Sequence, residues 1–211
     1  MDHMFSKRAL RQTWADVRPY FVFSAIVFFA SFVVGGSNRI DTSLLEQQAQ
    51  ALESLAGMAG QSEHPRLFLF LIVLINNVFK SIFTMYAGVI ACIWPLFMLV
   101  TNGTLLGFLL DQVGEQGGNP WLIFATAILP HGIFELPAIF LACAFGLRFG
   151  VMLFRGLAGS VRGKPDAWKG FVQTATGSVP GMVIVSLLLL AGAIVESTLS
   201  LWLASLVPPV S

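Results

Sequence analysis

Long apolar runs separated by short polar segments dominate the sequence. A helix that crosses a hydrocarbon layer of about 30 Å needs about 17 to 25 residues, and each run supplies enough of them. The pattern predicts an all-α polytopic membrane protein whose one membrane domain covers residues 1–211. We expect five transmembrane helices, at residues 20–36, 67–85, 88–110, 121–148 and 176–197. The run from residue 67 to 110 is twice the length of one span, so it must fold back near Tyr86–Gly88.

The charged residues gather in the polar segments, and their sign alternates. Residues 1–19 carry more basic than acidic side chains, and so does the segment 150–170, which holds Arg155, Arg162, Lys164 and Lys169 against Asp166. The segment 111–120 carries Asp111 and Glu115 and no basic residue. Because cytoplasmic loops are enriched in Lys and Arg, we expect a multi-pass protein of the cell membrane. Its N-terminus and an inner basic loop at 150–170 then face the cytoplasm, and its C-terminus lies outside. A cleaved signal peptide is the alternative interpretation of the first apolar run.

Residues 37–66 form the longest polar segment. Ser43 and Glu46 have the spacing of a helix-capping box, and apolar residues follow with helical periodicity. We expect an amphipathic helix at about 43–57, outside the membrane and resting on its surface or on other helices. A surface that binds a partner protein is the alternative.

One stretch, residues 129–137, places polar side chains inside an apolar run. His131 and Glu135 are four residues apart and therefore lie on one face of a helix. Pro130, Gly132 and Pro137 predict a helix break here, because proline lacks a backbone donor and glycine is permissive. Unpaired backbone groups in hydrocarbon cost several kcal/mol each, so we expect this stretch to face protein or a wet cavity.

Further polar residues fall at similar depth in the second span. At 1.5 Å per residue, Asn76 and Asn77 lie about 15 Å down that span and Lys80 about 21 Å, level with His131 and Glu135 respectively. We expect an intramembrane polar cluster in which Lys80 pairs with Glu135 and an asparagine amide contacts His131. Such a cluster either locks helices together or forms an active or transport site. The secondary polar residues at membrane depth are Asn102, Arg148 and Glu196.

The chemistry of known enzyme sites does not fit this sequence. The chain is 56% hydrophobic and 11% charged, against about 25% charged in soluble domains. It holds no His-Glu-x-x-His, no Gly-x-Ser-x-Gly and no nucleotide-binding Gly-x-x-x-x-Gly-Lys motif. We expect no enzyme activity, no catalytic residues, no metal site and no cofactor. The lipid bilayer, other membrane or cell-envelope proteins and a second copy of the chain are the expected partners, and nucleic acid is not.

Several short strings resemble the stage II sporulation protein M family. They are Asn76-Asn77, the stretch from Asn102 to Gly107, the string from Pro130 to Ala138, Gly146 to Gly150, and Glu196. The resemblance runs from about residue 65 to 200, and its most specific part is the Pro-His-Gly-x-x-Glu-x-Pro-Ala string. It implies an integral membrane scaffold, which in endospore formers holds cell-wall-degrading partners at the septum. Many relatives occur in organisms that make no spores.

Two functions from different classes follow. The first is a non-enzymatic scaffold that binds partners through residues 37–66 and through the basic residues 155–169. The second is a channel or carrier for a small solute or ion, in which a broken helix at mid-membrane offers backbone groups and His131 acts as a proton-linked switch. No inverted repeat is visible, and five spans are few for a monomeric carrier, although a homodimer would lessen that objection.

Overall fold

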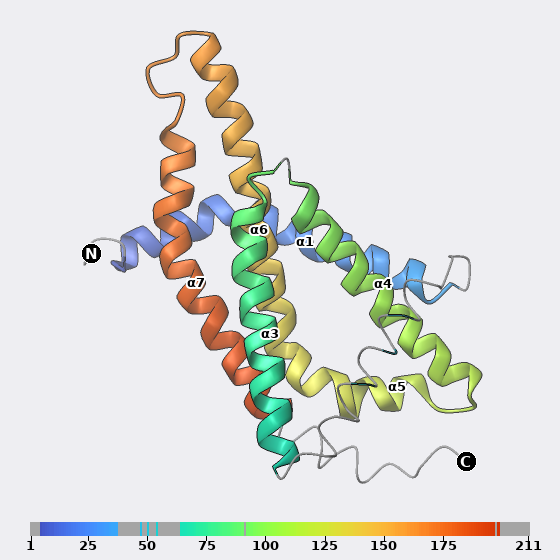
Figure 1. Cartoon of the computed structure of the whole chain (residues 1–211). Coiled ribbons are helices and arrows are strands. Elements are labelled where there is room, and N and C mark those ends of the chain that lie inside the picture. The colour runs from blue at the N-terminus through green and yellow to red at the C-terminus, as the bar shows by residue number, and fades with distance from the viewer. Residues whose placement is uncertain are drawn as a thin grey trace. The chain divides into compact units, whose positions relative to one another are not determined.

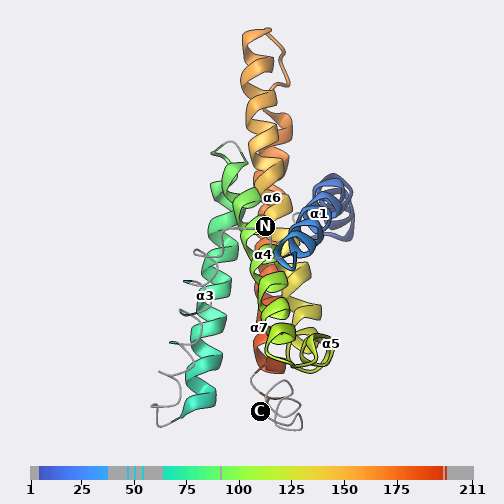
Figure 2. The same ribbon diagram turned by 90° about the vertical axis from the view of Figure 1, so that its right-hand side faces the viewer.

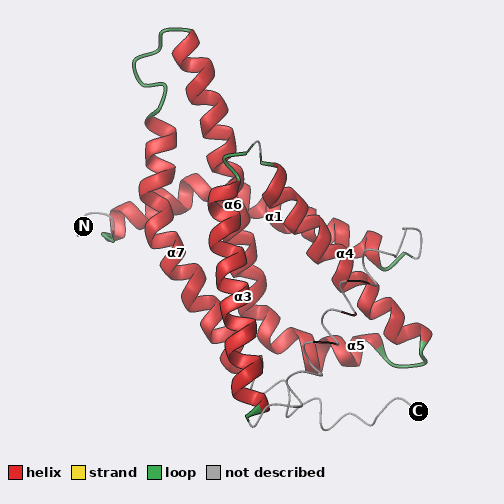
Figure 3. Cartoon of the chain, in the orientation of Figure 1, coloured by secondary structure: helices red, strands yellow, loops and turns green. Residues whose placement is uncertain are grey.

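A computed structural model describes residues 5–37, 64–90, 92–196 and 198, together with residues 47, 50 and 54. Five long helices make up most of it, and the described residues contain no strand (Figures 1 and 3). The helices are α1 (Lys7–Gly35), α3 (Pro65–Ala87), α4 (Ile93–Glu115), α6 (Leu129–Val161) and α7 (Lys169–Val195). Each is long and apolar enough to cross a membrane. The predicted all-α polytopic membrane class is confirmed.

Several of the predicted boundaries differ from those of the structure. The third long helix begins at Ile93 instead of residue 88, and the described residues before it, 88–90 and 92, form a turn. The first begins at Lys7 instead of residue 20, and most of the segment 150–170, expected as a loop, is helical. The physical reason is that apolar length marks the part of a helix that can sit in lipid, whereas hydrogen bonding continues through polar residues until a breaker intervenes. The expected outer helix at 43–57 lies outside the described residues, apart from residues 47, 50 and 54.

The expected helix break at Pro130–Pro137 is also wrong. Helix α6 begins one residue before Pro130 and runs through Gly132 and Pro137 without interruption. The irregularity lies just before α6 in the chain. There the short helix α5 (Pro120–Ile123) leads into a π-helical turn, η1 (Phe124–Ile128). In that turn the N–H of Leu129 donates to the carbonyl of Phe124, five residues back. A proline ring presses on the carbonyl four residues before it, so a widened turn before Pro130 accommodates it without ending the helix.

The residues cluster into two compact units. Unit 1 consists of Met1–Val27, Val78–Leu99 and Pro137–Leu187, and unit 2 consists of Phe28–Asn77, Val100–Leu136 and Leu188–Ser211. Each unit contains a part of every long helix, so neither corresponds to a continuous stretch of sequence.

In unit 2, two glycines of α4 bring its backbone against α1. A Cβ atom added at Gly103 would overlap the carbonyl oxygen of Phe28, and one added at Gly107 would overlap that of Phe32. The two contacts repeat after four residues on both helices, so the helices lie side by side over at least one turn. The Gly-x-x-x-Gly spacing therefore serves packing within the chain.

In unit 1, the turn that joins α3 to α4 packs directly on α6. A Cβ atom at Gly88 would overlap the carbonyl oxygen of Gly146, and the thiol of Cys92 donates to the carbonyl of Leu147 over 3.3 Å. A Cβ atom at Gly150 would lie 3.0 Å from the backbone nitrogen of Cys92. The turn at 88–92 is therefore level with residues 146–150 of α6.

Also in unit 1, α6 and α7 continue past that turn as a helical hairpin closed by residues 162–168 (Figures 1 and 2). The ring of Trp168 packs on Gly156, and its Nε1–H donates to the hydroxyl of Ser160 over 2.9 Å. Gly159 meets Ala167, and Gly170 meets the sulfur of Met152. Trp168 thus fastens the two helices of the hairpin to each other.

The contact between α1 and α4 can be tested with one alanine. We expect Gly107→Ala to lower the free energy of unfolding by about 1 to 3 kcal/mol, because the new methyl group meets backbone that cannot rotate away. The measurement is thermal or denaturant unfolding of the purified protein in detergent.

Gly132→Ala is the matched control, since its Cβ would have no neighbour nearer than Leu136 Cδ1 at 4.0 Å. This variant should be neutral or slightly more stable, because alanine favours a helix over glycine by about 0.5 to 1 kcal/mol. Equal stability of the two variants would show that α1 and α4 do not make this contact.

Candidate intramembrane polar site

A hydrogen bond between α3 and α6 is the centre of the candidate site in unit 2. The side-chain amide of Asn77 donates to Oε1 of Glu135 over 3.2 Å, and both residues are half-buried. The structure places the amide of Asn77 on Glu135, one helical turn further along α6 than His131. The expected contact between an asparagine amide and His131 stays a prediction. A hydrogen bond between side chains contributes about 0.5 to 1.5 kcal/mol, so this bond links the two helices.

Helix α7 approaches Glu135 through a glycine that sequence reasoning missed. A Cβ atom at Gly192 would lie 2.8 Å from Cγ of Glu135 and 3.5 Å from the carbonyl oxygen of His131. Gly192 therefore leaves the space that the glutamate side chain occupies. One signal could have revealed it: Gly192 lies four residues before Glu196, on the same face of α7.

Glu196, expected as a secondary polar residue, belongs to this site. It follows the last residue of α7, is half-buried, and interacts electrostatically with Glu135. The structure thus brings together two carboxyl groups and one amide from α3, α6 and the end of α7. Carboxylates and amides can hold a proton or a hard cation, and they can also link helices in a low-dielectric surrounding.

The other residues predicted for the site lie at its edge or elsewhere. His131 is half-buried one turn before Glu135 on α6, and the side chain of Asn76 is exposed on α3. Lys80 is exposed and belongs to unit 1, so its pairing with Glu135 stays a prediction. Asn102 is half-buried on α4, next to the glycine that contacts α1.

Arg148, the remaining secondary polar residue, forms an ion pair in unit 1. It is 4% exposed, and its Nη2 lies 2.7 Å from Oδ2 of Asp16 on α1. Its Nη1 is buried without a hydrogen-bond partner among the described residues. A buried guanidinium without a counter-charge would be costly, so the pair ties α1 to α6. Sequence reasoning missed Asp16, because 132 residues separate the two partners.

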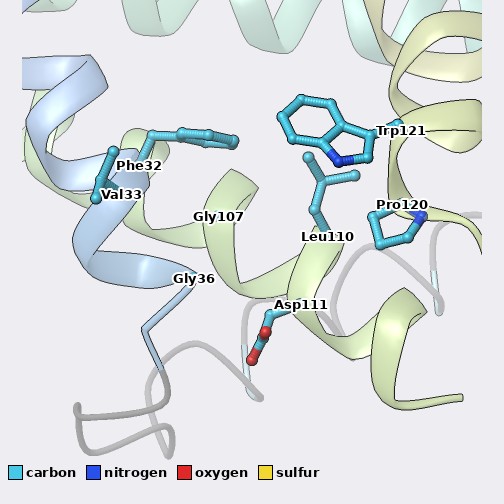
Figure 4. Close-up of a pocket in the computed structure, with 8 residues that line it drawn as sticks. All are labelled: Phe32, Val33, Gly36, Gly107, Leu110, Asp111, Pro120 and Trp121. Atoms are coloured by element: carbon cyan, nitrogen blue, oxygen red, sulfur yellow. The ribbon is translucent and has the colours of Figure 1, made fainter.

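A pocket of about 290 Å³ in unit 2 lies between the end of α1, the end of α4 and the start of α5 (Figure 4). Its walls are mostly apolar and include Phe32, Leu110, Pro120 and Trp121. Asp111 supplies the one charged group, and its carboxylate points away from the rings of Phe32 and Trp121. The hollow therefore lacks the convergent polar groups that orient a specific ligand.

The bond between Asn77 and Glu135 predicts a difference between two neighbouring asparagines. We expect Asn77→Leu to lower the free energy of unfolding by about 1 to 3 kcal/mol, because it leaves the carboxylate without its donor. Asn76→Leu is the matched control on the exposed side of the same turn and should change stability by no more than about 0.5 kcal/mol. Unfolding in detergent compares the two variants, and equal losses would rule out the assigned bond.

Comparison with known proteins identifies the family of this chain. The family model described as Stage II sporulation protein M matches residues 20–201. An uncharacterised protein of Methanocaldococcus jannaschii is 25% identical over 140 residues, which are 66% of this chain and 59% of that protein. The chain thus spans about three fifths of the length of this curated relative. No solved structure matches the chain. Since the family model covers most of its residues, the chain belongs to the stage II sporulation protein M family.

Proposed function

We propose that this membrane protein is a non-enzymatic scaffold that holds partner proteins at the membrane. The observation that carries the proposal is the α6–α7 hairpin in unit 1, which continues well past the turn between α3 and α4 (Figures 1 and 2). Five helices can cross a bilayer without a projection of this kind, which is built from two long helices. It offers a rigid surface on which another protein can assemble.

The turn at 88–92 supports this reading, because a turn between two spans belongs at the membrane surface, where water can satisfy its backbone groups. The turn is level with Gly146–Gly150 of α6, and α6 then continues for 11 residues to Val161. At 1.5 Å per residue the helix extends about 16 Å past the turn. The hairpin thus reaches beyond the head groups, which occupy about 5 to 8 Å on each side of the hydrocarbon.

The charges support a cytoplasmic position for the hairpin. Arg155, Arg162, Lys164 and Lys169 outnumber Asp166 there, and the basic start of α1 belongs to the same unit. Basic segments near the ends of spans remain in the cytoplasm. The scaffold would then present the hairpin to partners inside the cell.

The site around Glu135 fits a structural role in this scaffold. Asn77 joins α3 to α6, and Gly192 lets α7 close on the same carboxyl group. Polar side chains that link helices at membrane depth keep a bundle in one arrangement, because the alternative is an unsatisfied polar group in hydrocarbon. A projecting hairpin needs such a fixed base.

A second function, a channel or carrier for an ion or small solute, is favoured by one observation. Glu135 and Glu196 interact, and ionisable residues at membrane depth mark ion pathways in many transporters. The two functions predict different results for the same variant.

We expect the protein in liposomes to show no proton, sodium or potassium flux above that of empty vesicles, because Glu135 serves packing. Glu135→Gln should keep this baseline, and its free energy of unfolding should change by no more than about 1 kcal/mol, because the glutamine carbonyl can still accept from Asn77. Ion-sensitive dyes and unfolding in detergent provide the two measurements. A flux that the wild-type protein shows and Glu135→Gln loses would favour the carrier and overturn the scaffold.

The scaffold also predicts a stable assembly. A tagged full chain, extracted gently from its native membrane, should run on native gels as a complex that contains another membrane or envelope protein at a fixed ratio. An unrelated five-span protein, tagged and extracted alike, is the control. A chain that migrates alone or with copies of itself would contradict the proposal.

A further inference from the structure

The first three turns of α1 carry a row of basic side chains with a tryptophan among them. All four residues of this row are exposed, and they are Lys7, Arg11, Trp14 and Arg18. They follow one another at positions i, i+4, i+7 and i+11 of one helix. Since one residue advances a helix by about 100°, the four side chains lie within about 60° of one another. We call these four residues the basic row.

The basic row faces away from the helices on which α1 packs in unit 1. Oδ2 of Asp16 lies 2.7 Å from Nη2 of Arg148 on α6. A Cβ atom added at Gly177 of α7 would lie 2.9 Å from Cγ2 of Thr13. By helical geometry, the basic row lies about 130° to 170° round α1 from Thr13 and Asp16. Within the part of the chain that the structure describes, no basic side chain of the row forms an ion pair.

The same contacts place the start of α1 at the surface of the membrane. Arg148 lies in the stretch of α6 that is level with the turn between α3 and α4, and such a turn belongs where water can reach its backbone groups. The hydroxyl of Ser178, beside the glycine of α7, lies 3.3 Å from the hydroxyl of Tyr86 near the end of α3. The residues of α1 that contact α6 and α7 are therefore close to the level of this turn.

The first part of α1 crosses α7 and then α6 instead of running alongside them (Figures 1 and 2). Its contact with α7 comes first in the chain, and its contact with α6 follows three residues later. The basic row is about 16 Å long. Because the helix crosses the hairpin at the level of the turn, the whole row stays near the depth of the head groups.

We propose that the basic row binds the head groups of anionic phospholipids, with its three basic side chains on the phosphates and Trp14 at the boundary to the acyl chains. Basic residues on one face of a membrane-surface helix attract anionic lipids, and tryptophan is enriched at this boundary. The charge of the row selects this occupant, because a second copy of the chain would bring like charges together.

The membrane orientation of the chain does not by itself require such a row. The positive-inside rule depends on the number of basic residues near a span, whereas a binding row needs them on one face. Arg8 is exposed but lies about 90° round α1 from the row. The inference does not depend on the scaffold function.

Native mass spectrometry of the purified full chain tests the selectivity for anionic lipid. The protein is released from micelles that contain equal amounts of phosphatidylglycerol and phosphatidylcholine with the same acyl chains. We expect the wild-type chain to retain phosphatidylglycerol in excess. The combined change Lys7→Gln, Arg11→Gln and Arg18→Gln should lower the ratio of bound phosphatidylglycerol to phosphatidylcholine at least about tenfold, which corresponds to 1.4 kcal/mol.

A charge-matched control replaces three exposed basic residues outside the row. Arg8→Gln together with Arg162→Gln and Lys164→Gln removes the same net charge, from the other side of α1 and from the far end of the hairpin. This variant should keep the wild-type lipid ratio. Equal losses in the two triple variants would overturn the row as the site, because the total charge alone would then explain the preference. Unfolding in detergent checks that both variants are folded.

Photo-crosslinking locates the bound lipid while all basic residues stay in place. Trp14→p-benzoylphenylalanine exchanges one aromatic side chain of the row for another, in vesicles of phosphatidylcholine with a minority of phosphatidylglycerol. Among the lipid adducts, phosphatidylglycerol should exceed its share of the vesicle. Ile90→p-benzoylphenylalanine is the matched control, since Ile90 is 73% exposed in the turn between α3 and α4 and should capture lipids in their bulk ratio.

Three results would overturn the proposal: a wild-type chain without a preference for phosphatidylglycerol, a bulk lipid ratio at Trp14, and an adduct of Trp14 with a second copy of the chain. An enrichment at Trp14 that persists after the three basic residues are replaced would also overturn it. None of these results bears on the scaffold function, which predicts a complex with another protein.

Discussion

Direct backbone contact between helices at glycine is the constraint on which the structure depends. Helices that are apolar on nearly all sides gain little from the hydrophobic effect once lipid surrounds them, so close packing and polar links hold them together. Gly107 allows α1 and α4 to touch in unit 2, and Gly88 allows the turn between α3 and α4 to touch α6 in unit 1. Gly192 has a different use, since it makes room for the side chain of Glu135. At Gly107 and Gly88 a single methyl group would meet backbone and push the contacting elements apart.

The few polar side chains at membrane depth act where such contacts bring helices together. Asn77 and Glu135 join α3 to α6 in unit 2, and Asp16 and Arg148 join α1 to α6 in unit 1. Both links connect segments far apart in the chain, and both involve a charged group that would be costly to bury alone. Helix α6 takes part in each of them. It is therefore the helix whose position the polar contacts define most directly.

Helix α6 also links the membrane part to the surface proposed for function. Its 33 residues exceed what one crossing requires, and the excess forms half of the hairpin. Within the hairpin, small residues such as Gly156 and Gly159 keep the two helices close, which leaves the larger side chains of α6 on the outside. The packing that stiffens the hairpin thus creates an apolar face with no partner in the hairpin itself.

The sequence by itself determined the class of fold, the number of long apolar helices and most of the residues that matter at the site. Apolar runs of sufficient length leave few alternatives to helices in a membrane, and His131, Glu135, Asn77 and Glu196 stand out because polar groups are rare there. Helix ends were predicted less well. Hydropathy marks the apolar part of a helix, and α6 and α7 continue through polar residues beyond that part.

The tertiary structure decided the partners and the local backbone. Depth counting along straight helices cannot resolve one turn, so the sequence-based prediction did not assign the bond between Asn77 and Glu135. It could not pair Asp16 with Arg148, because separation along the chain says nothing about proximity in space. It also treated Pro130 as a break, whereas a π-helical turn before it absorbs the ring. The reason is common to all three cases: composition and period fix which side chains a helix carries, and only the packing of one helix on another fixes what those side chains meet.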